Sequence, residues 1–151
     1  MTFSIWLVKL HIPRHLFSRQ SMLVTPLFAA LFGLFYFILS INVVRFRIGQ
    51  KVSLGSGDNR DIEKAIRIHA NFIEYVPLIL LLFYFYEVMS LSGSLVFFLA
   101  SALFIARICH ITGMLNPKEW MLLRQLGAGV TFLVLLAISV ALALRYIPVT
   151  V

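Results

Sequence analysis

The chain has 151 residues, of which 61 % are hydrophobic and 13 % charged, and its mean hydropathy is +0.96. This composition excludes a soluble globular protein and indicates an integral membrane protein with one domain. The net charge of +7 comes from basic residues that flank apolar runs, so membrane lipids are expected as partners and nucleic acid is not. The single cysteine, Cys109, excludes an intrachain disulfide, and no metal-ligand spacing occurs, so no bound metal is expected.

Residues 1–21 precede the first long apolar run and contain the short hydrophobic segment Phe3 to Val8. That segment is too short for the core of a signal peptide, and no small-residue cleavage site follows it. The region is either an interfacial amphipathic helix or an extension ahead of an alternative start at Met22. We expect it to be dispensable for the fold and the site, which leaves residues 22–147 as the membrane domain.

Four membrane-spanning helices are predicted, over about residues 22–46, 62–90, 93–115 and 120–147. Three uncharged runs, at positions 20–44, 88–106 and 125–144, each come close to the ~20 residues needed to cross a bilayer. The run between Glu74 and Glu87 is too short to cross alone. The second span must therefore start near Ile68 and carry Glu74 into the membrane.

The helix ends follow from local signals in the sequence. Asn59 or Asp61 is the expected N-cap of the second helix, and Asn116-Pro117 should end the third. Pro77 lies inside the second helix and is expected to bend it. Glu87, at the far end of that helix, is expected to face water.

The basic residues predict how the chain crosses the membrane. One side receives Arg45, Arg47, Lys51, Arg60, Lys64, Arg67, Lys118 and Arg124, with Arg107 near it. The other side has only Lys9, Arg14, Arg19 and Arg145. The positive-inside rule then places both termini outside and the 1–2 and 3–4 connections in the cytoplasm.

A stripe of polar side chains runs along the second helix and consists of Glu63, Arg67, Asn71 and Glu74. At 100° per residue these positions point toward about 0°, 40°, 80° and 20°, which is one narrow face. Polar and charged groups near lipid cost several kcal/mol unless they meet partners or a ligand. The stripe therefore indicates a binding site, and pairing of Glu74 with a packing arginine is the main alternative.

Further polar groups lie at the same depth. They are Tyr75, Arg107, His110, Arg124 and, at the end of the first helix, Arg45. The arginines could instead reach lipid headgroups, and His110 could satisfy a helix-end carbonyl. His69 points away from the stripe, at about 240°, and is expected to be structural or interfacial. Arginine forks bind carboxylates and a buried glutamate binds ammonium, so a small peptide-like ligand such as glutathione fits.

The pattern Glu63-x-x-x-Arg67-x-x-x-Asn71-x-x-Glu74-Tyr75-x-Pro77, followed by Arg107-x-x-His110, resembles the MAPEG family, the membrane-associated proteins in eicosanoid and glutathione metabolism. The resemblance covers about residues 22–147. It implies an all-α, homotrimeric, integral membrane four-helix bundle of the bacterial type, located in the inner membrane. Glutathione would be its co-substrate, bound between adjacent subunits near the cytoplasmic face.

The resemblance also assigns roles to residues. The glutathione-binding residues would be Arg45, Arg67, Asn71, Glu74, Tyr75 and His110. Arg124 is similar to a helix-four arginine held near the sulfur, and Arg107 is the second candidate for that catalytic role. Met114 stands where eicosanoid-forming members have a tyrosine, and Gly127-Ala-Gly129 stands where a tyrosine is common early in helix four, so an eicosanoid substrate is not expected.

The resulting prediction is a membrane-bound, glutathione transferase-like enzyme. It would conjugate glutathione to a hydrophobic small molecule from the bilayer, or reduce a lipid hydroperoxide. The alternative is a non-catalytic trimeric scaffold that binds lipid or glutathione. A transporter or channel component is disfavoured because the charged residues gather at one end instead of lining a path.

Overall fold

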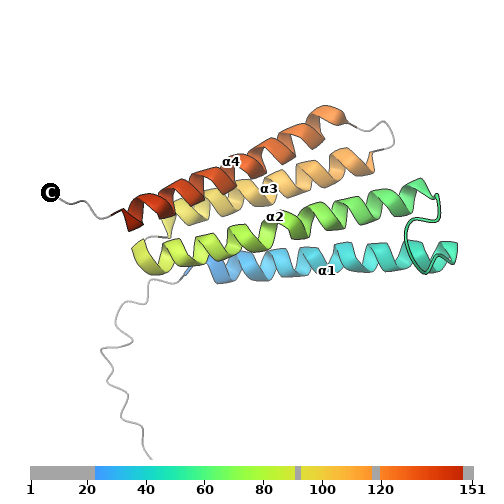
Figure 1. The fold of residues 1–151 in the computed structure, drawn as a ribbon, viewed down its shortest axis with the longest axis horizontal. Helices are drawn as coiled ribbons and strands as arrows, with labels where there is room; N and C mark the ends of the chain where they lie inside the picture. Colours follow the sequence, from blue (N-terminus) through green and yellow to red (C-terminus); the bar gives the residue numbers. More distant parts are fainter. Residues whose placement is uncertain (1–22, 91–92, 117–119, 148–151) are drawn as a thin grey trace, which may run out of the picture.

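A computed structural model describes residues 23–90, 93–116 and 120–147. These residues form four helices: α1 (Thr25–Gln50), α2 (Arg60–Ser90), α3 (Ser94–Leu115) and α4 (Met121–Tyr146). The helices lie side by side along one long axis, with the 1–2 and 3–4 connections at the same end (Figure 1). The predicted all-α bundle is confirmed, and each helix begins and ends within about one turn of its predicted position. The expected dispensable segment 1–21 and Lys118 lie outside the described residues.

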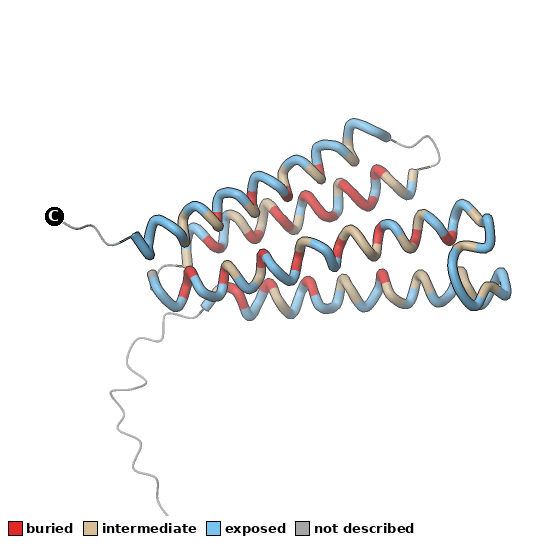
Figure 2. Tube along the Cα trace, in the orientation of Figure 1, coloured by how far each residue is buried: buried red, intermediate tan, exposed pale blue. Residues whose placement is uncertain are grey.

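All four helices are long and apolar enough to cross a membrane. The shortest, α3, has 22 residues, which corresponds to about 33 Å at 1.5 Å per residue. Exposed residues lie along all four helices of the protomer (Figure 2). They include large apolar side chains such as Leu34, Phe98 and Leu133. Such a surface suits lipid or a neighbouring subunit.

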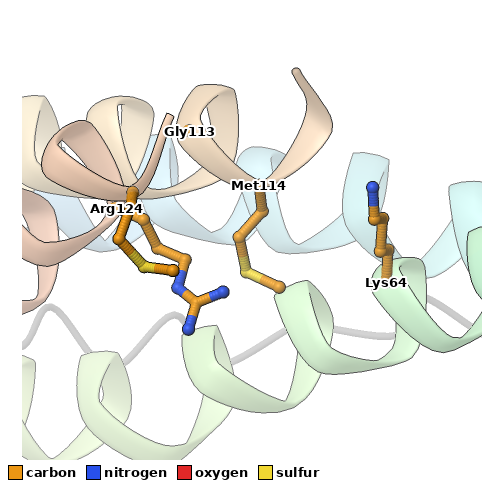
Figure 3. Close-up of a pocket in the computed structure, with 5 residues that line it drawn as sticks. Lys64, Gly113, Met114 and Arg124 are labelled. Atoms are coloured by element: carbon orange, nitrogen blue, oxygen red, sulfur yellow. The ribbon is translucent and has the colours of Figure 1, made fainter. Parts of the chain in front are cut away.

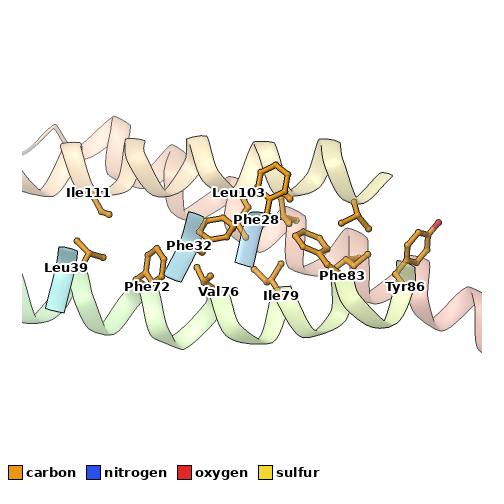
Figure 4. Close-up of a cluster of buried hydrophobic side chains, with 14 of the residues drawn as sticks. Phe28, Phe32, Leu39, Phe72, Val76, Ile79, Phe83, Tyr86, Leu103 and Ile111 are labelled. Atoms are coloured by element: carbon orange, nitrogen blue, oxygen red, sulfur yellow. The ribbon is translucent and has the colours of Figure 1, made fainter. Parts of the chain in front are cut away.

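The centre of the bundle is packed with aromatic and aliphatic side chains (Figure 4). Phe32 of α1 is 1 % exposed, and its ring centre lies 6.0 Å from that of Phe72 and 5.6 Å from that of Phe104. Edge-to-face contacts of this kind join α1 to α2 and α3. Because lipid tails are as apolar as the core, close packing rather than water exclusion must hold the spans together.

The local signals at the ends of α2 and α3 act as predicted. The side-chain oxygen of Asn59 accepts hydrogen bonds from the backbone N–H groups of Asp61 (2.9 Å) and Ile62 (3.1 Å), so Asn59 is the N-cap of α2. Asn116 is extended, with ψ of 131°, as expected for the residue before a proline. The helix α2 continues through Pro77 without interruption.

Glu87 does not face water, and that expectation is wrong. Its side chain is 1 % exposed, and its two carboxylate oxygens accept hydrogen bonds from the backbone N–H groups of Val24 (2.7 Å) and Thr25 (2.8 Å). The start of α1 has no side-chain cap of its own. The end of α2 therefore supplies one, and the negative charge also suits the positive end of the α1 dipole. Gly93 leaves room for this contact, because a Cβ there would lie 3.1 Å from Glu87 Oε1.

Replacing Glu87 by glutamine should lower the free energy of unfolding by about 1–3 kcal/mol. Glutamine has one acceptor oxygen, and its NH₂ group would face a backbone N–H that needs an acceptor. Denaturant titration of the purified protein in mild detergent measures the change. Glu63→Gln, at an exposed position of α2, is the matched control and should cost less than about 0.5 kcal/mol. Equal losses in the two variants would contradict the capping role.

Candidate functional site

A cleft of ≈ 360 Å³ opens between α2, α3 and α4, at the end of the bundle that carries the 1–2 and 3–4 connections. Its lining residues are Arg67, Ala70, Asn71, Glu74, His110, Met114 and Arg124. Five of the eight site residues expected from the sequence are among them. The helical stripe of α2 supplies one wall, as its 100° periodicity predicts, while Glu63 lies outside the lining.

The cleft has a positive and a negative end. Arg67 and Glu74 are both exposed and are separated by seven residues, which is about 10 Å along the helix. Among the described residues no ion pair joins Glu74 to an arginine, so pairing within the protomer does not account for this carboxylate. Arg124 adds a second guanidinium from α4 on the opposite wall. The arrangement suits a ligand that carries both an ammonium and a carboxylate group.

Arg107 lies behind the cleft and does not line it. Its side chain is 2 % exposed, and Nη1 donates to the side-chain oxygen of Asn71 at 2.8 Å. Nη2 donates to the hydroxyl of Thr131 and, at 3.4 Å, to the carbonyl of Gly127. Arg107 therefore ties α3 to both α2 and α4. All these acceptors are neutral, so Arg107 places a buried positive charge directly behind Asn71.

The bond from Arg107 also fixes the orientation of Asn71. Because the Oδ1 atom of Asn71 accepts from the guanidinium, its NH₂ group is left to donate elsewhere. Asn71 is half-buried and lines the cleft. A ligand carbonyl or carboxylate in the cleft would match this donor.

His110 borders the cleft and also contacts the backbone of α4. Its Nδ1 atom lies 3.1 Å from the backbone carbonyl oxygen of Arg124, and the ring is 7 % exposed. A carbonyl only accepts, so Nδ1 carries the hydrogen and Nε2 is the acceptor of the neutral ring. His110 thereby fixes the first turn of α4, from which the Arg124 side chain projects.

Gly127 lies at a point where α3 and α4 pack closely against each other. A Cβ at Gly127 would lie 2.6 Å from the carbonyl oxygen of Ala106 and 2.7 Å from the backbone nitrogen of His110. At this point the backbones of α3 and α4 meet, so no larger side chain fits. Gly129 has open space around it and makes no such demand.

Two expected site residues lie apart from the cleft in the protomer. The Tyr75 ring packs edge-on against Phe132 of α4, with 5.4 Å between the ring centres. Arg45 is exposed near the end of α1, where it lines two separate hollows together with Asn42. His69 is structural as expected: its Nε2 lies 3.2 Å from the hydroxyl of Ser40.

Sequence reasoning missed several residues that build the site. Thr131 and Gly127 hold the Arg107 guanidinium, and nothing in the local sequence indicated this contact, because 20–24 residues separate the partners. In the sequence, Lys64 indicated only the orientation of the chain in the membrane, yet Lys64 lines a smaller hollow beside Arg124. The i, i+3 spacing of Lys64 and Arg67 was the available signal.

Four candidate spans, three of which line a cleft with two arginines and a carboxylate, define a small multi-pass membrane protein with a polar cleft at one end. Residues 25–144 match the MAPEG family, and the chain belongs to that family. It is also 32 % identical over 127 residues to the inner membrane protein YecN of Escherichia coli strain K12, which covers 83 % of this chain and 94 % of YecN. The same figures hold for YecN of E. coli O6:H1 strain CFT073.

No solved structure matches the chain. The expected family is confirmed, and so is the location, because the spans and the relatives both indicate a multi-pass protein of a bacterial inner membrane.

Proposed function

We propose that the protein binds glutathione in the cleft and conjugates its thiolate to hydrophobic electrophiles from the bilayer. The observation that carries this proposal is the convergence of Arg67, Glu74 and Arg124 on one cleft, from two helices that are each apolar enough to span a membrane. Membership of the MAPEG family supports it. The volume of ≈ 360 Å³ lies within the range of small-molecule sites, roughly 300–1,000 Å³.

Each end of the ligand has a complementary group. Glu74 would receive the ammonium of the γ-glutamyl residue, and Arg67 would hold a carboxylate in a two-pronged contact. The Asn71 NH₂ group, oriented by Arg107, would donate to a ligand oxygen. Ionised contacts of this kind contribute about 1.5–3 kcal/mol each where water is excluded.

The chemistry requires the glutathione thiol to lose its proton. The sulfur lone pair then forms a bond to an electrophilic carbon, and the leaving group departs with its electrons. Arg124 would stabilise the thiolate, and the buried charge of Arg107 would add to the local positive potential. Reduction of a lipid hydroperoxide would consume two glutathione molecules and release an alcohol, water and glutathione disulfide.

The proposed active form is a homotrimer. Arg67 and Glu74 are exposed in the protomer although they belong to a helix that is long and apolar enough to span the membrane, so we expect a neighbouring subunit or the ligand to cover them. A neighbour could also bring Arg45 or Tyr75 to the site. Native mass spectrometry from mild detergent should show three copies. A strict monomer or dimer would contradict this assembly.

A non-catalytic scaffold is the second candidate, and one observation favours it. A hollow of ≈ 300 Å³ beside α1 is lined by Phe35, Ile38 and Ile111, with Asn42 and Arg45 also in its wall. An acyl chain would fit the apolar part, and Arg45 would hold an anionic headgroup. In that case the protein would bind lipid without turning it over.

One sample separates these functions. Purified protein in mild detergent is titrated with glutathione by calorimetry and then incubated with chlorodinitrobenzene, and mass spectrometry detects the conjugate. Binding together with conjugate formation is expected. Binding without conjugate formation would favour the scaffold. Absence of binding would contradict a glutathione site, and flux of glutathione into sealed vesicles would restore the transporter hypothesis.

A further inference from the structure

A second, smaller hollow lies next to the cleft, at the end of the bundle that carries the 1–2 connection. It measures ≈ 60 Å³ and is lined by Lys64, Gly113, Met114, Met121 and Arg124. Met114 and Arg124 line both hollows, so the two are direct neighbours. Figure 3 shows the Arg124 side chain directed from α4 toward α2, with Met114 between it and Lys64.

The charged residues of α2 that line the two hollows change sign along the helix. Lys64 comes first on α2, Arg67 lies one turn further, and Glu74 lies ten residues from Lys64. Ten residues of helix span about 15 Å. The outer end of the site is therefore cationic and the inner end anionic, which gives a bound zwitterion one preferred direction.

We infer that Lys64 binds the glycine carboxylate of glutathione, with the γ-glutamyl ammonium at Glu74. This inference rests on the proposed function and adds a subsite to it. An α-linked tripeptide spans at most about 10–11 Å when extended, and the γ-linkage of glutathione adds roughly two bonds, so side chains at both ends must still reach inward to meet it. Lys64 is half-buried, and its four-carbon stem gives it that reach. An ammonium group has three donors, so the contact that Lys64 already makes within the chain leaves room for a ligand.

The walls of the smaller hollow suit an ionic contact. Met114 and Met121 provide flexible apolar surfaces that adapt to a ligand and exclude water. Gly113 keeps α4 close, because a Cβ there would lie 2.7 Å from the backbone nitrogen of Arg124. With Lys64 on the carboxylate, the Arg124 guanidinium is left to face the middle of the ligand, where the cysteine lies.

The test is a thermodynamic cycle that measures the coupling between the Lys64 side chain and the glycine carboxylate of the ligand. Calorimetry compares glutathione with its glycine ethyl ester, in which an ethyl ester replaces the terminal negative charge, on wild type and Lys64→Gln; a steric effect of the ethyl group would appear in both proteins. Wild type should lose about 10-fold in affinity on esterification. Lys64→Gln should bind glutathione about 10-fold more weakly than wild type does. The affinity of this variant for the ester should be less than about 3-fold below its affinity for glutathione.

Controls keep the outcomes distinct. Lys51→Gln removes a lysine from the same side of the protein but outside both hollows, and it should behave as wild type. Lys64→Arg retains the charge and should retain the penalty of esterification, which excludes a folding defect as the cause. An equal esterification penalty in wild type and Lys64→Gln would overturn the assignment of Lys64 alone. Absence of glutathione binding in wild type would overturn the proposed function and this subsite with it.

Discussion

Replacing Glu74 by glutamine, or Arg67 by alanine, is expected to weaken glutathione binding by about 2–4 kcal/mol, roughly 30- to 900-fold. Both side chains line the cleft, and among the described residues no arginine neutralises Glu74. The loss is large because each variant also leaves a ligand charge without its partner, in a site that a neighbouring subunit of the proposed trimer would shield from water. Calorimetry in mild detergent measures it.

Glu63→Gln is the matched control for Glu74→Gln. Glu63 lies on the same helical stripe and is exposed, but it does not line the cleft. Its substitution should leave affinity within about 2-fold of wild type. The oligomeric state of all three variants should be unchanged, because within the part of the chain that the structure describes neither Arg67 nor Glu74 forms a hydrogen bond to another helix. Unchanged affinity in both Arg67→Ala and Glu74→Gln would refute the site.

The fold was predictable because its signals are local. The absence of charge over about 20 residues marks a span, and Asn59 and Asn116-Pro117 mark helix ends by their own backbone preferences. One wall of the cleft was equally accessible, since residues three and four apart on a helix share a face whatever the helix packs against. Arg67, Asn71 and Glu74 needed no tertiary information.

The opposite walls and the ends of the bundle were not predictable in the same way. Glu87 caps a helix whose start lies 62 residues earlier in the chain, and its burial depends on where α1 docks. Arg107 has the sequence context of a site arginine, yet Asn71 and Thr131 enclose it. Whether an arginine faces a cleft or supports its wall is decided by inter-helix contacts, and the periodicity of one helix carries no information about them.

Arg124 lines the cleft whereas Arg107 lies behind it, so substitutions of the two should have different effects. Arg124→Ala is expected to reduce conjugation of chlorodinitrobenzene about 10- to 100-fold while weakening glutathione binding less than about 5-fold. Arg124 lines both hollows and is held in place through the contact of its carbonyl with His110. Its guanidinium would lower the thiol pKa of bound glutathione from about 8.5, which raises the thiolate population at neutral pH. Removing it should return that pKa toward its ordinary value.

Arg107→Ala should act by a different route. It removes a buried cation that joins three helices and strands the acceptors of Asn71, Gly127 and Thr131, so it should lower the free energy of unfolding by about 3–5 kcal/mol. Glutathione affinity should fall as well, because the Asn71 amide loses its fixed orientation. Arg107→Lys keeps the charge but not the fork, and it should recover only part of the stability.

Thiolate absorbance near about 240 nm, titrated against pH with glutathione bound, distinguishes the two roles. Wild type should show a depressed thiol pKa, Arg124→Ala should lose that depression without losing stability, and Arg107→Lys should keep it while unfolding at lower denaturant. A titration that Arg124→Ala did not alter would remove Arg124 from the chemistry. If wild type itself showed an ordinary thiol pKa, nothing in the cleft would activate the sulfur. The protein would then be the binding scaffold, because a carboxylate and two arginines suffice to hold glutathione but not to make it react.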